Sequence, residues 1–234
     1  MIRQRLGKDL LFFDGGMGTL LQEKGLAPGE LPETWNLTHS EEIYKIHRQY
    51  IEAGSDIILT NTFGANALKF HDDSCSLEEI IKAAVSHVKK AEREALLQTG
   101  DERKIYTALD VGPTGKLLKP MGDLEFETAY EAFKEVVILG EQAGADLIHI
   151  ETMSDTYELK AAVLAAKENT SLPVFATVIF DERKKLLTGA DVSSVVALLE
   201  GLGVDALGIN CAMGPKEMLP VLEELINIRL FRLL

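Results

Sequence analysis

The chain has 234 residues, of which 46% are hydrophobic and 26% charged, as in an ordinary globular protein and unlike a disordered one. Its formal net charge of -13 at pH 7 excludes the basic surface that binding to nucleic acid or to an anionic membrane requires. No long apolar window and no signal-peptide core occurs, so we expect a cytoplasmic protein that binds a small molecule and enters no membrane.

Six short apolar runs, each ended by a polar residue, alternate with stretches of helical periodicity. The runs cover residues 11–13, 57–59, 105–109, 147–150 and 174–176, and a sixth ends at residue 209. The predicted helices cover residues 40–53, 76–98, 125–143, 154–169, 191–202 and 215–226. Strands that alternate with helices of this length predict parallel βαβ units.

Boundary signals support several of these helices. Ser40 and Ser76 each stand just before a pair of glutamates, which is typical of an N-cap followed by an acidic first turn. Gly54, Gly144 and Gly203 stand just past three predicted helix ends, where glycine commonly stops a helix.

Two architectures fit the alternation, a doubly wound open sheet and a (β/α)8 barrel. The open sheet predicts a Gly-x-Gly-x-x-Gly turn after the first strand, but Leu21 stands where the third glycine belongs. A polar residue closes every run at its C-terminal end, which is the face where barrel active sites are built. We therefore favour the α/β class with a (β/α)8 TIM barrel.

About six of the eight βα units of such a barrel are visible, in a single incomplete domain over residues 1–226. Residues 227–234 form an atypical basic and apolar tail, which we interpret as a C-terminal truncation. A short amphipathic extension of the last helix is the alternative. Without two further strands, the first and sixth strands would be open edges.

The residues that end the runs are expected to meet at one face of the sheet. They are Asp14, Asn61, Asp110, Glu151, Asn210 and Cys211. No lysine ends a run, which argues against a Schiff-base aldolase. His149 lies inside a run between two isoleucines, so packing is the favoured role for it over catalysis.

Asp14 and Glu151 are a pair of carboxylates that suits an ammonium group, or acid–base work if one pKa is raised. The backbone amides at Gly15 and Gly16 suit a carboxylate, because glycine lets the main chain approach a ligand closely. Together these features predict an amino acid as ligand. The alternative for Asp14 is a purely structural cap of the turn that follows it.

The two cysteines lie in different settings. Cys75 is in a polar segment before a predicted helix, whereas Cys211 ends an apolar run just before a helix start. A reducing compartment and these settings argue against a disulfide between them. We expect the thiol of Cys211 to face a ligand and Cys75 to be incidental.

Several motifs in the same order resemble the homocysteine S-methyltransferase family, most closely the N-terminal homocysteine-binding modules of cobalamin-dependent methionine synthases. They are Phe-Asp-Gly-Gly-Met-Gly-Thr at 13–19, Trp-Asn-Leu-Thr at 35–38, Ala-Gly-Ser-Asp-Ile-Ile-Leu-Thr-Asn-Thr-Phe-Gly-Ala-Asn at 53–66, Asp-Val-Gly-Pro-Thr-Gly at 110–115, Ile-Glu-Thr-Met at 150–153 and Gly-Ile-Asn-Cys at 208–211. The resemblance covers the chain up to about residue 226.

The resemblance implies a (β/α)8 barrel that activates the homocysteine thiol on zinc for methyl transfer, giving methionine. Cys211 matches the first of three zinc-binding cysteines, and the other two would lie in a Gly-Gly-Cys-Cys motif beyond the end of this sequence. Methylcobalamin and methyltetrahydrofolate would act only through other modules. We therefore expect the chain alone to bind zinc poorly.

The resemblance also implies roles for individual residues. Asp14 and Glu151 would hold the homocysteine amine, and the backbone around Gly16, Gly18 and Thr19 its carboxylate. Asn61, Asp110 and Asn210 would line the site.

Three alternatives stay open. The chain would be a non-catalytic amino-acid-binding fragment, a half-barrel that needs a partner chain carrying the missing strands, or a family member that takes its methyl group from betaine or S-methylmethionine. Metal-free binding without preference for a thiol would identify the first, and size-exclusion behaviour with the partner fragment the second.

Overall fold

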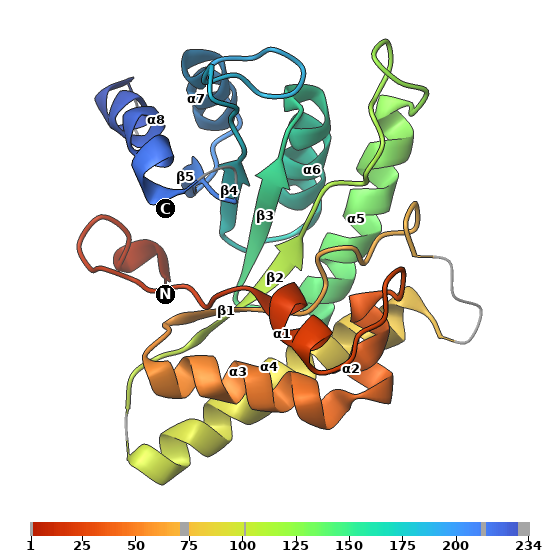
Figure 1. The fold of residues 1–234 in the computed structure, drawn as a ribbon, viewed down its shortest axis with the longest axis vertical. Coiled ribbons are helices and arrows are strands. Elements are labelled where there is room, and N and C mark those ends of the chain that lie inside the picture. Colours follow the sequence, from red (N-terminus) through yellow and green to blue (C-terminus); the bar gives the residue numbers. More distant parts are fainter. Residues whose placement is uncertain (1, 71–74, 101, 212–213, 229–234) are drawn as a thin grey trace.

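The computed structural model describes residues 2–70, 75–100, 102–211 and 214–228, and within them five parallel strands form one sheet (Figure 1). The strands are β1 Ile57–Leu59, β2 Tyr106–Val111, β3 Leu147–Met153, β4 Val174–Val178 and β5 Ala206–Ile209. Their order in the sheet is the order in the chain. A doubly wound sheet reverses its strand order at a switch point, so this topology fits the barrel prediction instead.

The helices from residue 77 onward pack on the outer side of the sheet, where they share a large apolar core with the outward residues of the strands. The α-helices are α1 Met17–Glu23, α2 Trp35–Thr38, α3 Ser40–Ala53, α4 Leu77–Thr99, α5 Phe126–Ala143, α6 Thr156–Asn169, α7 Val192–Gly201 and α8 Pro215–Ile228. Two short 3-10 helices, η1 Ile2–Gln4 and η2 Pro32–Thr34, precede α1 and α2.

All six predicted helices are confirmed, with ends shifted by one or two residues. Ser76 forms a full capping box with Glu79, whereas Ser40 is the first residue of α3 and its side chain caps nothing. The predictions missed α1, α2 and η2, which lie between the first apolar run and α3.

The prediction of a strand over residues 11–13 was wrong. This segment makes only one parallel bridge, between Phe13 and Ile57. The ladder stops because the next partner of the Leu59 amide is not a main-chain carbonyl but the Asp14 side chain, whose Oδ2 accepts at 3.1 Å. The segment still occupies the place of a first barrel strand beside β1.

Three aspartates tie the N-terminal ends of neighbouring strands together. Each follows a helix-ending glycine of positive φ by two residues, accepts the backbone N–H of the adjoining segment on Oδ2, and donates its own N–H back to the same residue. The pairs are Asp56 with Phe12, Asp146 with Thr107 and Asp205 with Val174, at 3.0, 2.9 and 2.9 Å. This repeated device sets the register from one βα unit to the next.

The N-terminal segment closes the bottom of the sheet. Ile2 and Leu6 are buried in an inner cluster with Tyr106, Leu147 and Phe175 from three strands. Arg3 Nε donates to Asp205 Oδ1 at 2.5 Å, which links this segment to the start of β5. The inner side of the sheet is therefore filled below the level of the strand ends.

The C-terminal tail is only partly described. Helix α8 continues to Ile228, two residues beyond its predicted end, and the rest of the predicted tail lies outside the described residues. Cys75 and Cys211 are not joined by a disulfide in this structure. No helix among the described residues has the length and apolar character needed to span a membrane.

Candidate functional site

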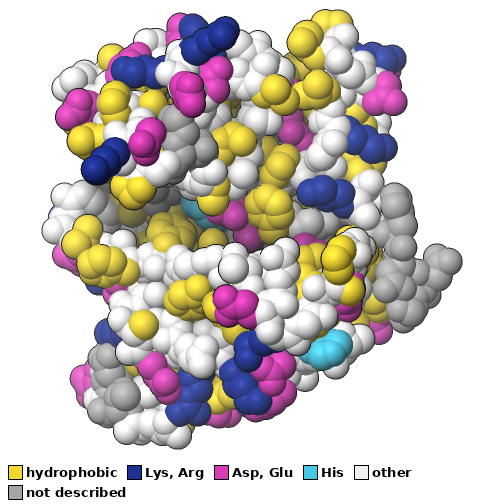
Figure 2. Space-filling view, in the orientation of Figure 1, with side chains coloured by type: hydrophobic (Ala, Val, Ile, Leu, Met, Phe, Trp, Pro, Cys, Tyr) yellow, Lys and Arg dark blue, Asp and Glu magenta, His cyan; other side chains and the backbone are white. Residues whose placement is uncertain are grey.

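A cavity of about 500 Å³ opens at the C-terminal ends of the strands. In the space-filling view a cleft separates the half of the molecule with α1–α4 from the half with α6–α8, and acidic and histidine side chains show at its floor (Figure 2). The residues that line the cavity are Phe13, Asp14, Gly15, Gly16, Met17, Gly18, Pro32, Glu33, Leu59, Thr60, Asn61, Phe63, Asp110, His149, Glu151, Thr177, Ile209, Asn210 and Cys211.

Most of the predicted site residues meet here. The six that end the apolar runs all line the cavity, and so do Gly16 and Gly18. Thr19 does not: it lies exposed in the first turns of α1 and is absent from the lining. The prediction for this segment concerned its backbone N–H groups, and it stays a prediction for Thr19.

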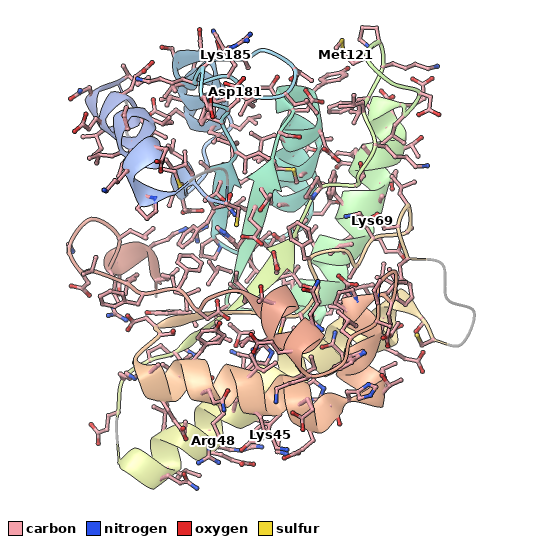
Figure 3. All side chains as sticks on the ribbon, viewed as in Figure 1. Lys45, Arg48, Lys69, Met121, Asp181 and Lys185 are labelled. Carbon is pink, nitrogen blue, oxygen red and sulfur yellow. The ribbon has the colours of Figure 1, made fainter. Side chains whose placement is uncertain are left out.

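The cavity is acidic. Four carboxyl groups line it, from Asp14, Glu33, Asp110 and Glu151, and among the described residues no lysine or arginine is part of the lining. Lys69 lies outside the lining, and its charge lowers the pKa of Glu33 against the rise caused by burial. Lys45 and Arg48 lie along the outer side of α3, and Lys185 lies toward the opposite end of the molecule (Figure 3). A cationic group brought by a ligand would therefore meet several acceptors.

Three of these carboxyl groups have a buried oxygen without a hydrogen-bond partner among the described residues. The oxygens are Oδ1 of Asp14, Oε2 of Glu33 and Oδ1 of Asp110. Nδ1 of His149 and Oγ1 of Thr177, which also line the cavity, are buried and unpartnered as well. Buried polar groups are normally satisfied, so a set of unsatisfied ones around a cavity indicates a polar ligand.

Asp14 is held by β1 rather than by the turn that follows it. Its Oδ2 accepts from the Leu59 N–H, so the structural-cap alternative does not describe its main contact. Burial, helped by the negative charge of Glu151, raises the pKa of Asp14 to about 8. This carboxyl group therefore exchanges its proton near neutral pH.

Asp110 and Glu151 interact directly across neighbouring strands. Burial raises the pKa of Asp110 well above its usual value, and the charges of Glu151, Asp14 and Glu33 add to the rise. Burial also raises the pKa of Glu151, while hydrogen bonds from Asp110 and Asn210 oppose that rise. Burial of both groups and their proximity therefore favour a proton on this pair, and the larger number of neighbouring charges favours it on Asp110.

Asn210 is the first residue after β5 and reaches across to the end of β3. Its Nδ2 donates to Glu151 Oε2 at 3.0 Å and to Thr152 Oγ1 at 2.8 Å. Its Oδ1 accepts from the Thr152 N–H at 3.2 Å. Both amide hydrogens are thus used within the protein.

Asn61 is likewise engaged in internal contacts. Its Nδ2 donates to the Pro32 carbonyl at 2.7 Å, and its own carbonyl accepts from Asn36 at 2.8 Å. These bonds hold the segment before α2 against the end of β1. Asn61 shapes the wall of the cavity through that segment.

Sequence patterns missed two residues of the site. Glu33, only 3% exposed, comes from η2, and its Oε1 accepts from the Gly64 N–H at 2.6 Å. No strand-end signal marks it, because its burial depends on a contact 31 residues away in the chain.

His149, predicted as a packing residue, is buried but faces the cavity, 5.0 Å from the ring of Phe13. Its Nε2 lies 3.7 Å from Glu151 Oε2, too far for a hydrogen bond. Burial lowers the pKa of His149 to about 3, so its ring is neutral and does not balance the carboxylates.

Cys211 stands exposed at the cavity with a left-handed φ of 51°. Partial burial and the charge of Glu151 raise the pKa of its thiol. No group of three histidine, cysteine, aspartate or glutamate side chains in the described part of the chain is arranged to hold a metal ion. These residues alone do not fit a complete zinc site, and Cys211 is one ligand at most.

Comparison with known proteins agrees with this geometry. The family model described as homocysteine S-methyltransferase matches residues 11–233. Methionine synthase from Mycobacterium leprae (strain TN) is 33% identical over 226 residues, which are 92% of this chain and 19% of that protein. Methionine synthase from Mycobacterium tuberculosis (strain ATCC 25618 / H37Rv) is 34% identical over 224 residues, again 19% of its length. The chain thus spans about a fifth of the length of these relatives.

Among solved structures, the homocysteine methyltransferase MmuM from Escherichia coli, in its metallated form, superposes with a TM-score of 0.86 at 24% identity. The match covers 97% of this chain and 83% of that one. It shows the fold and confirms the predicted barrel class. Because the family model matches nearly the whole sequence, this chain belongs to the homocysteine S-methyltransferase family.

Proposed function

We propose that this chain is the homocysteine-binding module of a methyltransferase of the methionine synthase type. The observation that carries the proposal is the cavity at the strand ends, whose described lining has four carboxyl groups and no basic side chain. Such a site favours a ligand with an ammonium group over one with a phosphate or a second carboxylate near the acids.

The two ends of the amino acid have separate places in this proposal. Its ammonium group binds Asp14 and Glu151, with the proton of Asp110 available to adjust the charge. Its carboxylate binds backbone N–H groups around Gly16 and Gly18, which line the same cavity. The sulfur then points to the mouth, where Cys211 stands.

The reaction needs the thiolate form of the substrate. An alkyl thiol has a pKa of about 8.5, so only a few per cent is ionised at pH 7. The thiol loses its proton to solvent water, the sulfur forms a bond to the methyl carbon, and the bond between methyl and donor breaks with its electrons remaining on the donor. The product is methionine.

The methyl donor and the metal are assigned by family likeness alone. Cys211 would be one of three zinc-binding thiolates, and the described residues supply no second or third ligand. By the same family likeness, methylcobalamin and methyltetrahydrofolate would act through other modules. A polypeptide that completes the barrel is a further partner under this proposal.

Calorimetric titration tests the ligand assignment. L-Homocysteine should bind, and Glu151→Gln should weaken it about tenfold or more, because a charged hydrogen bond to the amine is lost. Binding of 4-mercaptobutyrate, which lacks the amine, should be weak and insensitive to the same change. Glu182→Gln, an exposed site away from the cavity, is the matched control.

Two results would reject the proposal: no measurable homocysteine binding, or equal effects of Glu151→Gln on both ligands. A second candidate function, metal-free binding of amino acids in general, is favoured by the same acidic cavity. Equal affinity for homocysteine and methionine would select that candidate.

A further inference from the structure

The end of β3 departs from regular strand geometry beside the cavity. The pairing of β3 with β4 shifts register between Ile150 and Met153, and Thr152 adopts a φ of 61°. Ile150 and Met153 both lie in the outer core, although regular alternation would place them on opposite faces. The extra residue therefore leaves Glu151 facing the cavity and returns Met153 to the helix side.

A left-handed φ is unfavourable for a β-branched residue such as Thr152 and persists only where the surroundings hold it. Asn210 does so with two contacts, since its Oδ1 accepts from the Thr152 N–H and its Nδ2 donates to Thr152 Oγ1. The second hydrogen of Nδ2 goes to Glu151 Oε2. A primary amide has two donor hydrogens, and Nδ2 of Asn210 contacts both of these residues within hydrogen-bond distance.

We propose that Asn210 is a positioning residue, which holds the bulge at Thr152 and aims the Glu151 carboxylate at the amine of the substrate. This inference rests on the proposed homocysteine site. In this inference the side-chain amide of Asn210 does not contact the substrate. It acts through Glu151, at the end of β3. Loss of the amide donor leaves Glu151 free to turn from the cavity and reduces affinity for amine-bearing ligands only.

Asn210→Asp is the informative substitution, because it keeps the shape and the acceptor for the Thr152 N–H but removes the donor to Glu151. We expect homocysteine affinity to fall about tenfold, with little change for 4-mercaptobutyrate. In a Glu151→Gln background the same substitution should cost no further affinity, since the carboxylate through which Asn210 acts is gone.

Asn169→Asp is the matched control, because Asn169 also donates to two partners, Tyr130 and Ala165, but lies on α6 away from the cavity. It should leave both affinities unchanged. If Asn210→Asp impairs folding, Thr152→Gly supplies a background in which glycine adopts the left-handed conformation without strain. The loss of homocysteine affinity should persist there.

The outcomes distinguish a failure of the proposed function from a failure of the role proposed for Asn210. Failure of the wild-type protein to bind homocysteine rejects the proposed function and this inference with it. Binding by the wild-type protein with equal losses for both ligands, or with additive effects of Asn210→Asp and Glu151→Gln, rejects the inference alone and leaves Asn210 a purely structural residue. A double-mutant cycle with a non-additive, amine-dependent loss supports it.

Discussion

Asp14 links ligand binding to folding through a single buried carboxyl group. Its pKa is about 8 in the folded chain and close to 3.8 when unfolded, mainly because burial disfavours its charge. A group whose pKa rises on folding contributes its full stability below the unfolded pKa and loses it as the pH approaches the folded pKa. The contribution of Asp14 to the free energy of unfolding therefore falls between about pH 4 and pH 8.

We predict that Asp14→Asn makes the free energy of unfolding less dependent on pH, with a gain on the order of a few kcal/mol at pH 8. The same substitution should weaken homocysteine binding. Urea unfolding at intervals from pH 4 to pH 8 measures the slope. Asp123→Asn, at an exposed site, should leave the slope as it is. An unchanged slope in Asp14→Asn would show that this carboxyl group is ionised in the folded protein.

His47 has the opposite effect on stability at a place remote from the cavity lining. Both of its ring nitrogens are buried without partners among the described residues, and burial, with a smaller effect of His87, lowers its pKa to about 3. A histidine with a depressed pKa supports the fold above about pH 6.5 and opposes it as the pH falls toward 3.

We predict that His47→Leu raises stability at pH 5 by about 1–3 kcal/mol, since an apolar side chain of similar volume removes two unsatisfied groups. Thermal unfolding at pH 5 and pH 7 measures the difference, which should be larger at pH 5. His39→Leu, at an exposed site, controls for the loss of a histidine. A stability loss at both pH values would mean that His47 is satisfied by bound water in solution.

At the scale of elements, the close contact between α5 and β2 depends on a residue without a side chain. Gly140 lies buried in α5, and a Cβ placed there would overlap the side chain of Leu109 on β2. Alanine is favoured over glycine inside a helix by about 1 kcal/mol, but overpacking of a core costs about 1–3 kcal/mol. The steric effect should therefore win.

Gly140→Ala is predicted to destabilise the protein by about 1–2 kcal/mol in urea unfolding. Gly201→Ala is its matched comparison, because Gly201 ends α7 and a Cβ there would meet nothing within 4 Å. That change should be neutral or slightly stabilising. Equal effects of the two substitutions would contradict the packing argument.

At the scale of the whole molecule, metal content distinguishes a partial site from a complete one. Thiolate zinc sites with all their ligands contribute on the order of 10 kcal/mol or more, and the described residues offer Cys211 without a grouped partner. We predict that the isolated chain holds far less than one zinc per molecule, and that Cys211→Ala does not lower the content. Elemental analysis of freshly purified protein provides the measurement.

Near-stoichiometric zinc that survives mild chelation and disappears in Cys211→Ala would contradict this prediction. In that case further ligands come from another copy or another chain. The same sample with Cys75→Ala controls for adventitious binding at the other thiol.

Much of the fold was predictable because the signals were local. Apolar runs, helix periodicity and helix stops at Gly54 and Gly144 reflect interactions within a few residues, and these elements were confirmed. The first strand was not, because Asp14 interrupts its ladder with a side-chain contact to β1. That competition between two segments 45 residues apart leaves no trace in a local pattern.

By itself the sequence determined the order of βα units and the polar residues that end the strands, since parallel strands bring their C-terminal ends to one face. Only the tertiary structure decided which groups line the cavity, which way they face and how their pKa values are shifted. Glu33 enters through a contact with Gly64, His149 faces inward, and the bulge at Thr152 sets the direction of Glu151. Burial and charge proximity, which raise the pKa of Asp14, arise from chain segments that meet only on folding.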